Sequence, residues 1–278
     1  ERSEVDFEED ERLKIAVLGK PNAGKSTLVN RLLGEDRVIV SNVPGTTRDA
    51  IDSSFKYYGE EYVLIDTAGL RRKNKIYDEI ERYSILRAVT AVERADVCLI
   101  LIDAEYGITE QDAKIAGIAH NRGKASIIVV NKWDKIEKDN HTTKSFEKDI
   151  RETLSFMSYA PILYISALEG QRVNKIMETV LQVASEHAKR ITTGMLNDVI
   201  SEAILLNQPP ADKGRRLKIY YATQASVKPP TFILFVNNKE LIHFSYIRYL
   251  ENQVRNSFGF IGTPIIFLVR EKTDKDGK

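Results

Sequence analysis

The stretch Gly19-Lys20-Pro21-Asn22-Ala23-Gly24-Lys25-Ser26 decides the fold, because it fits the pattern G-x-x-x-x-G-K-[ST]. It follows the apolar run Ile15–Leu18 and opens a helical stretch from Ser26 to Leu33. Glycines at these positions let the backbone fold around an anion, and the positive end of the helix favours phosphate. We therefore expect Lys25 to reach the β- and γ-phosphates of a nucleotide and the Ser26 hydroxyl to bind Mg²⁺.

Short apolar runs alternate with helical stretches on either side of this loop. Such alternation predicts an α/β fold with a mostly parallel sheet flanked by helices, here over residues 13–190. Residues 52–58 alternate more strictly and lead into a turn at Tyr58-Gly59-Glu60, which predicts a hairpin with an edge strand. The other predicted strands are 15–18, 62–65, 97–102, 126–130 and 162–165, and the predicted helices are about 25–34, 76–94, 110–122, 142–157 and 172–190.

A second, smaller α+β domain is predicted over residues 191–271, with the order α-β-β-α-β. Its helices are Thr192–Leu206 and Ser245–Ser257, and its strands are Leu217–Thr223, Thr231–Val236 and Thr263–Val269. Residues 1–12 form an acidic linker with a charge of 2 − 7 = −5, and residues 272–278 a disordered tail. Residues 190–278 carry 13 − 8 = +5, which suggests a polyanionic partner or a merely solvated surface.

Composition excludes several classes of protein. No apolar run approaches the roughly 18 residues of a membrane span, and the polar, acidic start has no signal-peptide core. The single cysteine, Cys98, excludes an internal disulfide framework and is expected in the core. We expect a monomeric, cytoplasmic protein, and the first residue, Glu1, suggests a fragment or a processed chain.

The segment Asn131-Lys132-Trp133-Asp134 resembles the guanine motif N-K-x-D of the P-loop GTPases. A carboxylate at Asp134 can accept hydrogen bonds from guanine N1–H and N2–H₂, whereas adenine would leave it buried and unpaired. Asn131 would fix the loop, the Lys132 stem would cover the base, and Trp133 would pack beside the loop. Ser166-Ala167-Leu168 matches the S-A-x loop that backs the base in that family.

Two further segments match the switches of these GTPases. Asp66-Thr67-Ala68-Gly69 fits D-x-x-G, which implies that Asp66 holds Mg²⁺ and that the Gly69 amide touches the γ-phosphate. In Pro44–Asp49 the resemblance places a Mg²⁺-binding threonine, for which we choose Thr47 over Thr46. The implied catalytic residues are Lys25, Thr47, Asp66 and Gly69, and nucleotide contacts are further expected from Gly19, Lys20, Pro21, Asn22, Ala23, Gly24, Ser26, Thr27, Thr46, Thr67, Ala68, Leu70, Asn131, Lys132, Trp133, Asp134, Ser166, Ala167 and Leu168.

The residue after D-x-x-G is Leu70, where Ras-like proteins carry a glutamine that orients the attacking water. A leucine cannot position a nucleophile, so we expect slow basal turnover or another catalytic aid. Asn22 resembles the asparagine of GTPases in which K⁺ sits near the phosphates. We hypothesise K⁺-stimulated hydrolysis, with a purely structural role for Asn22 as the alternative.

Together, residues 44–49, 66–73, 131–134 and 227–232 make the region 13–271 resemble the second GTPase domain and the KH-like domain of the Der (EngA) family. This resemblance implies a role in assembly of the large (50S) ribosomal subunit, with rRNA and ribosomal proteins as partners. The chain has one P-loop where that family has two, so the family's first GTPase domain is missing.

Other features of the sequence leave the partner open. Gly259-Phe260-Ile261-Gly262 spells the G-x-x-G of nucleic-acid-binding KH loops, but its apolar centre favours a turn. Two groups of basic residues could contact RNA phosphates or simply form a solvated surface. They are Arg215, Arg216, Lys218 and Lys228, and, in switch II, Arg71, Arg72 and Lys73. The alternatives are a GTP-gated docking scaffold with hydrolysis only as a timer, and a tRNA-modifying GTPase of the MnmE type. The latter would be expected to carry a C-terminal cysteine.

Overall fold

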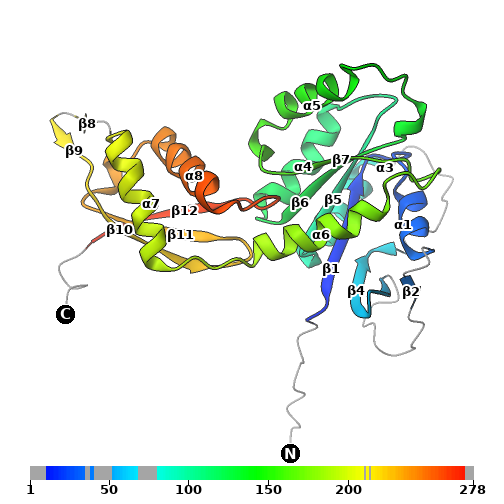
Figure 1. Ribbon diagram of the computed structural model, residues 1–278, viewed down its shortest axis with the longest axis horizontal. Helices are drawn as coiled ribbons and strands as arrows, with labels where there is room; N and C mark the ends of the chain where they lie inside the picture. Colours follow the sequence, from blue (N-terminus) through cyan, green and yellow to red (C-terminus); the bar gives the residue numbers. More distant parts are fainter. Residues whose placement is uncertain are drawn as a thin grey trace, which may run out of the picture.

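The structure is a computed structural model that describes residues 11–34, 38–40, 52–67, 80–209, 211–212 and 214–272. The described chain forms two main sheets, each with its own core, which lie side by side (Figure 1), and a short two-stranded sheet of β8 and β9. The larger sheet has the strand order β2-β3-β4-β1-β5-β6-β7, and the smaller one β10-β11-β12. Within the described ranges, none of the helices is long and apolar enough to span a bilayer.

The larger domain confirms the predicted mostly parallel α/β sheet. Strands β4, β1, β5, β6 and β7 run parallel, while β3 pairs antiparallel with both β4 and β2. Its elements are β1 (Leu13–Gly19), α1 (Lys25–Leu33), β2 (Val38–Val40), β3 (Ser53–Tyr57), β4 (Glu60–Ile65), α3 (Ile80–Arg94), β5 (Val97–Asp103), α4 (Glu110–Asn121), β6 (Ala125–Asn131), α5 (Thr142–Thr153), β7 (Ile162–Tyr164) and α6 (Asn174–His187).

Strand β5 explains why the central runs of the sequence are continuously apolar. Successive side chains of a strand point to opposite faces, and both faces of this sheet are covered. Val97, Leu99 and Leu101 lie in the core shared with α1 and α6. Cys98, Ile100 and Ile102 lie in the second core with α3, α4 and α5, and Cys98 is fully buried, as predicted.

Two predicted boundaries need correction. The hairpin of β3 and β4 exists, but β3 is not an edge strand, because β2 pairs with it through Val38–Val40. A strand of three residues is too short to show a recognisable alternation of apolar and polar residues, so it could not be predicted from the sequence. The helix predicted over 142–157 ends at Thr153 and is followed by a 3₁₀ turn at Ser155–Met157, which buries Met157.

The smaller domain has the predicted order α-β-β-α-β, with one short hairpin added before the first long strand. Helices α7 and α8 bury apolar side chains such as Ile200 and Leu250 against one face of the sheet. The elements are α7 (Thr193–Leu206), β8 (Ala211–Asp212), β9 (Arg215–Arg216), β10 (Ile219–Ser226), β11 (Thr231–Val236), α8 (Phe244–Phe258) and β12 (Ile266–Glu271).

The G-x-x-G segment forms a turn between α8 and β12, and this turn docks onto the larger domain. The Gly262 carbonyl accepts a hydrogen bond from the Ser126 amide at 2.7 Å, and the Gly262 amide donates to the Tyr159 carbonyl at 2.9 Å. The Phe260 amide donates to the Glu186 carboxylate at 2.6 Å. Because its backbone groups are used in this way, the turn is part of the interface between the domains.

The C-terminal end of α6 completes the interface. His187 is buried and its Nδ1 lies 2.7 Å from the Thr263 hydroxyl, while its carbonyl accepts from the Lys228 amide at 3.0 Å. Burial lowers the pKa of His187 to about 4, so the ring is neutral at physiological pH. A neutral, hydrogen-bonded histidine suits a buried contact, because no unpaired charge is taken out of water.

We predict that Gly262→Ala loosens this interface. An added Cβ would lie 2.4 Å and 2.6 Å from the two methyl carbons of Val183, at a φ of +75° that disfavours a side chain. Gly107→Ala is a matched control, since its φ is +67° and nothing lies within 4 Å of its added Cβ. Thermal and urea unfolding should show Gly262→Ala losing about 1–3 kcal/mol more than the control, by overpacking. Equal losses would show that the close approach to Val183 does not matter.

Candidate functional site

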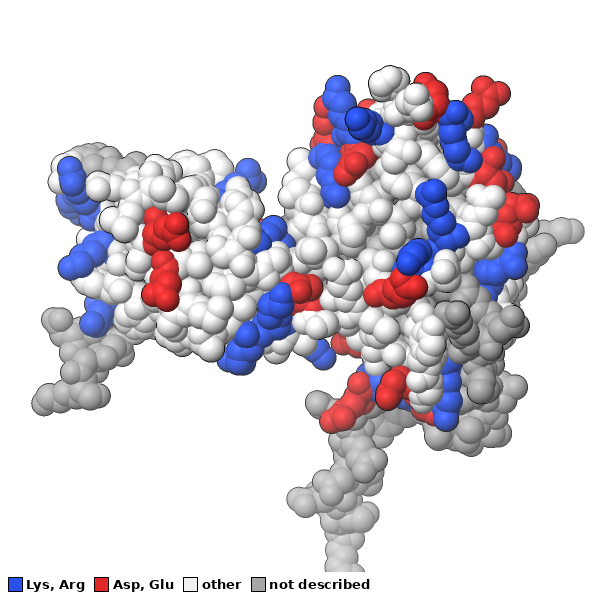
Figure 2. All heavy atoms as spheres, viewed as in Figure 1, with Lys and Arg blue, Asp and Glu red and all other residues white. Residues whose placement is uncertain are grey.

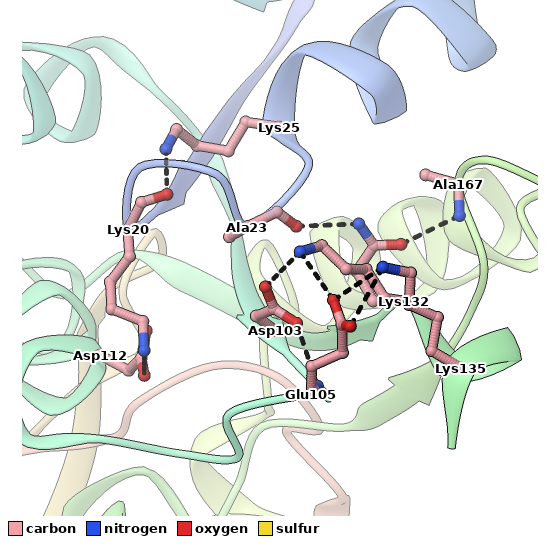
Figure 3. Close-up of polar contacts among 10 residues, drawn as sticks. Lys20, Ala23, Lys25, Asp103, Glu105, Asp112, Lys132, Lys135 and Ala167 are labelled. Atoms are coloured by element: carbon pink, nitrogen blue, oxygen red, sulfur yellow. Dashed lines mark hydrogen bonds and ion pairs between the residues drawn. The ribbon is translucent and has the colours of Figure 1, made fainter. Parts of the chain in front are cut away.

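The predicted site residues gather where the parallel strands end. Gly19 ends β1, Asp103 ends β5 and Asn131 ends β6, and the carboxyl ends of parallel strands meet at one edge of the sheet. Figure 3 shows Lys132, which follows β6, turned toward Asp103 and Glu105 at and after the end of β5. The edge therefore brings together the phosphate loop, the N-K-x-D segment and the S-A-x loop.

The phosphate loop depends on glycine at two positions. Gly24 has a φ of +95°, and a Cβ there would lie 2.2 Å from the Asn131 amide nitrogen. A Cβ at Gly19 would lie 2.6 Å from the Leu101 carbonyl oxygen. Between them Asn22 has a φ of +64°, a left-handed conformation that asparagine tolerates better than most residues. The loop thus has the tight curvature that an anion cradle requires.

Lys25 begins helix α1 and points its ammonium group back along the loop. Its Nζ donates to the carbonyls of Gly19 at 2.7 Å and Lys20 at 2.6 Å (Figure 3). Burial lowers the pKa of Lys25 to about 8, and the nearby Asp112 carboxylate opposes this shift. A partly desolvated ammonium at this point favours a polyanionic ligand.

Lys20 points its side chain away from the loop toward helix α4. Its Nζ lies 3.0 Å from the Asp112 carboxylate and 3.0 Å from the Thr109 hydroxyl. Asp112 is 1% exposed, and the same carboxylate oxygen accepts from the Thr109 amide and hydroxyl. The side chain of Lys20 therefore braces the loop, and its contact with a nucleotide stays a prediction.

Asn131 and Lys132, at and after the end of β6, connect the other loops of the site. The buried Asn131 amide donates to the Ala23 carbonyl at 2.9 Å and accepts from the Ala167 amide at 2.9 Å. Lys132 Nζ pairs with the carboxylates of Asp103 and Glu105 at 2.5 Å and 3.2 Å (Figure 3). Asn131 thus fixes the loop, as expected, and the two carboxylates orient the lysine stem.

Asp134 has one carboxylate oxygen, Oδ1, that is buried and lacks a hydrogen-bond partner among the described residues. A buried acceptor without a donor costs free energy unless a ligand supplies one. Trp133, next to it, turns its ring into the core against Phe146 and Tyr164, with ring centres 5.0 Å and 4.5 Å away. The motif therefore presents Asp134 and uses Trp133 as an anchor, which agrees with the expected place of Trp133 beside the loop.

The S-A-x loop and the first residues of α1 surround the same region. Ser166 is buried and its hydroxyl accepts from the Glu169 amide at 3.1 Å, while Leu168 is 64% exposed. Ala23 is buried, and Pro21, Ser26 and Thr27 are exposed at the surface. This arrangement leaves backbone amides and hydroxyls at the surface of the site.

Asp66 follows β4 with a left-handed backbone, at a φ of +58°. Its amide donates to the Asp52 carboxylate at 2.9 Å, and that carboxylate is also paired with Arg94. The Thr67 hydroxyl lies 2.7 Å from the Ser53 hydroxyl. The expected contacts of Thr46, Thr47, Ala68, Gly69 and Leu70 lie outside the described residues.

The described residues contain no group of three or more His, Cys, Asp or Glu side chains that could hold a metal ion. A magnesium ion held with a nucleotide usually takes most of its ligands from phosphate oxygens and water, so it does not need such a cluster. The Ser26 hydroxyl and the Asp66 carboxylate are the oxygen ligands that the described chain can add. This donor set fits the predicted Mg²⁺ site.

Sequence reasoning missed several supporting residues. Asp103 could have been found, because it stands at the carboxyl end of a central strand, where site residues collect. Asp112 forms a capping box with Thr109, a pattern that predicts a helix start without revealing the contact to Lys20. Asp52 and Arg31 carry no sequence signal, since their partners lie far along the chain.

A parallel sheet with this phosphate loop and an N-K-x-D segment at its carboxyl edge defines a P-loop GTPase domain. Residues 14–132 match the family model "50S ribosome-binding GTPase", and residues 190–270 match "KH-domain-like of EngA bacterial GTPase enzymes, C-terminal". The chain belongs to the Der (EngA) family of GTPases, of which it contains a GTPase domain and the C-terminal KH-like domain.

The relatives define how much of the family's length is present. The chain is 64% identical to GTPase Der of Alkaliphilus oremlandii over 268 aligned residues. The aligned region covers 96% of this chain and 61% of that protein. GTPase Der of Agathobacter rectalis is 62% identical, over 97% of this chain and 61% of its own length. A crystal structure of Era in complex with MgGDPNP and nucleotides 1506–1542 of 16S ribosomal RNA is 22% identical over 94% of both chains, with a TM-score of 0.47.

Proposed function

We propose that this chain binds guanine nucleotides and hydrolyses GTP at the edge of its larger sheet. The observation that carries the proposal is the buried, unpartnered Oδ1 of Asp134, which follows the strand β6. Guanine offers adjacent N1–H and N2–H₂ donors to such a carboxylate, whereas adenine presents no such pair. Buried hydrogen-bonding groups of this kind can favour the matching ligand, here guanine over adenine, by about 10⁴-fold.

The phosphate side of the site supports the same ligand. The loop amides and Lys25 would hold the phosphates, in place of the Gly19 and Lys20 carbonyls that Lys25 contacts in the structure. Ser26, Asp66 and, by resemblance, Thr47 would hold Mg²⁺, which neutralises charge on the phosphates when bound. The Gly69 amide would complete the cradle at the γ-phosphate.

We predict that Asp134→Asn exchanges the base preference. An asparagine keeps the size of the side chain but replaces one acceptor oxygen by an NH₂ donor, which faces the wrong partner on guanine and the right one on xanthine. GTP affinity should fall by about 10²-fold or more and xanthosine triphosphate affinity should rise, as calorimetry would measure. Lys25→Ala is the control, since it should weaken both nucleotides alike. Unchanged GTP binding by Asp134→Asn would contradict the proposed site.

We propose that hydrolysis is slow and aided by K⁺. The chain has Leu70 where Ras-like proteins place a water-orienting glutamine, and it has Asn22 in the phosphate loop. A monovalent cation near the phosphates could neutralise charge that develops in the transition state.

Turnover measured in KCl and in NaCl at equal ionic strength is expected to differ by at least about tenfold, with KCl faster. Asn22→Ala should remove the difference while leaving GDP binding within about threefold. Equal rates in the two salts would exclude the cation, and Asn22 would then have only a structural role in the loop.

We also propose that the intact protein acts in assembly of the large ribosomal subunit, as the family description of a 50S ribosome-binding GTPase suggests. The described chain offers one suitable surface, at the end of the KH-like domain far from the GTPase domain. Tyr220 is 42% exposed there, with the ammonium groups of Lys218 and Lys272 at 5.2 Å and 5.5 Å from its ring centre. Arg215 and Arg216 in β9 are also exposed.

Figure 2 shows Lys and Arg side chains distributed over this end of the KH-like domain. An aromatic ring flanked by cations suits single-stranded RNA, because bases stack on the ring and phosphates pair with the cations. The alternative is that the protein is a docking scaffold and that hydrolysis serves only as a timer. Both functions require binding that depends on the nucleotide.

Sedimentation with large subunits in GTP, in GDP and without nucleotide tests this proposal. We expect binding in GTP only, and the double variant Lys218→Ala, Lys272→Ala should weaken it about tenfold through lost phosphate contacts. Lys144→Ala, Lys148→Ala on α5 removes the same charge from the other domain and should have little effect. Binding that ignores the nucleotide would contradict a switch, and equal effects of the two double variants would contradict this surface.

A further inference from the structure

Arg31, on helix α1, reaches across to the S-A-x loop. Its Nε donates to the Ala167 carbonyl at 3.2 Å, and its terminal nitrogen donates to the Leu168 carbonyl. Gly170 lies under the same guanidinium, since an added Cβ there would be 3.5 Å from the Arg31 Cζ. One side chain thus holds consecutive carbonyls of a loop more than 130 residues away in the chain.

The backbone of Ala167 is therefore held through both its amide and its carbonyl. Its amide donates to the Asn131 side chain at 2.9 Å, and its carbonyl accepts from Arg31. The Asn131 side chain also donates a hydrogen bond to the Ala23 carbonyl in the phosphate loop. The two contacts link the S-A-x loop both to the phosphate loop and to the helix that follows it.

This loop needs such support because it has little regular structure of its own. Strand β7 ends at Tyr164, and the loop beyond it has a single bridge between Ser166 and Gln171. Helix α1, by contrast, begins at Lys25 and buries Leu28, Val29, Leu32 and Leu33 in the core. A helix anchored in the core can hold a loop in its binding conformation, so that less ordering is required when a ligand binds.

We propose that Arg31 is a positioning residue that holds the S-A-x loop in its base-binding conformation and thereby slows release of guanine nucleotides. The proposal rests on the proposed function, because it assigns the base to the region between Asp134 and this loop. Within the described part of the chain, the hydrogen bonds of the Arg31 side chain go to the backbone carbonyls of Ala167 and Leu168. Its planar guanidinium can hold two carbonyls at once, which a lysine ammonium on a flexible stem does less well.

The test compares a ligand that has a base with one that has none. Arg31→Ala should raise the dissociation rate of a fluorescent GDP analogue about tenfold, as expected for lost hydrogen bonds from a charged donor. Its affinity for inorganic triphosphate should stay within about twofold of the unchanged protein, because that ligand does not touch the loop. The GDP dissociation rate of Arg31→Lys should lie between those of the unchanged protein and Arg31→Ala.

Lys114→Ala is the matched control. Lys114 is exposed on α4 and has no hydrogen bond or ion pair within the described chain, so the variant removes one positive charge from a helix on the other face of the sheet. It should leave GDP release unchanged, which separates loop positioning from a general loss of attraction for anions. Thermal unfolding of each variant verifies that the fold is retained.

Two results would overturn the proposal. If Arg31→Ala released GDP at the original rate, the contact would have no part in binding. If it weakened inorganic triphosphate as much as GDP, Arg31 would act on the phosphate loop or on the whole fold. Failure of the unchanged protein to bind GDP while binding inorganic triphosphate would instead refute the proposed function, so the two failures are distinguishable.

Discussion

The side chain of Asn131 is the contact on which the site depends. It is 2% exposed and joins the Ala23 carbonyl of the phosphate loop to the Ala167 amide of the S-A-x loop. A nucleotide has a phosphate end and a base end, and this one amide sets the distance between the two loops that would hold them. Gly24 must lack a side chain because a Cβ would collide with the Asn131 nitrogen. The glycine of one motif and the asparagine of another are thus one structural unit.

Charged side chains around this unit mostly orient other protein groups. Asp103 and Glu105 hold Lys132, Asp112 holds Lys20, and Asp52 holds the Asp66 amide. Such supporting contacts keep functional groups in place before a ligand arrives, which lowers the cost of ordering them on binding.

The KH-like domain is held against the GTPase domain through backbone groups of the turn that the sequence spells G-x-x-G. Gly262 exchanges hydrogen bonds with Ser126 and Tyr159, and Arg255 donates to the Phe260 carbonyl at 2.6 Å, which fixes the turn from within. A motif that clamps nucleic acid in other KH folds is used here for a contact between domains.

The sequence by itself determined the fold class, the two sheets and the loops that form the site. The reason is that glycine conformations, strand ends and the periods of apolar residues are local properties of the chain. It also pointed to Lys25, Asn131 and Asp134, because Lys25 opens the helix after β1 and the other two lie at or just after the end of β6. Only the tertiary structure decided that Lys20 turns to Asp112, that Trp133 faces the core, that Arg31 holds Ala167 and that Gly262 contacts the other domain. Those contacts join residues far apart in the chain, and no local pattern encodes which distant surface a side chain or turn will meet.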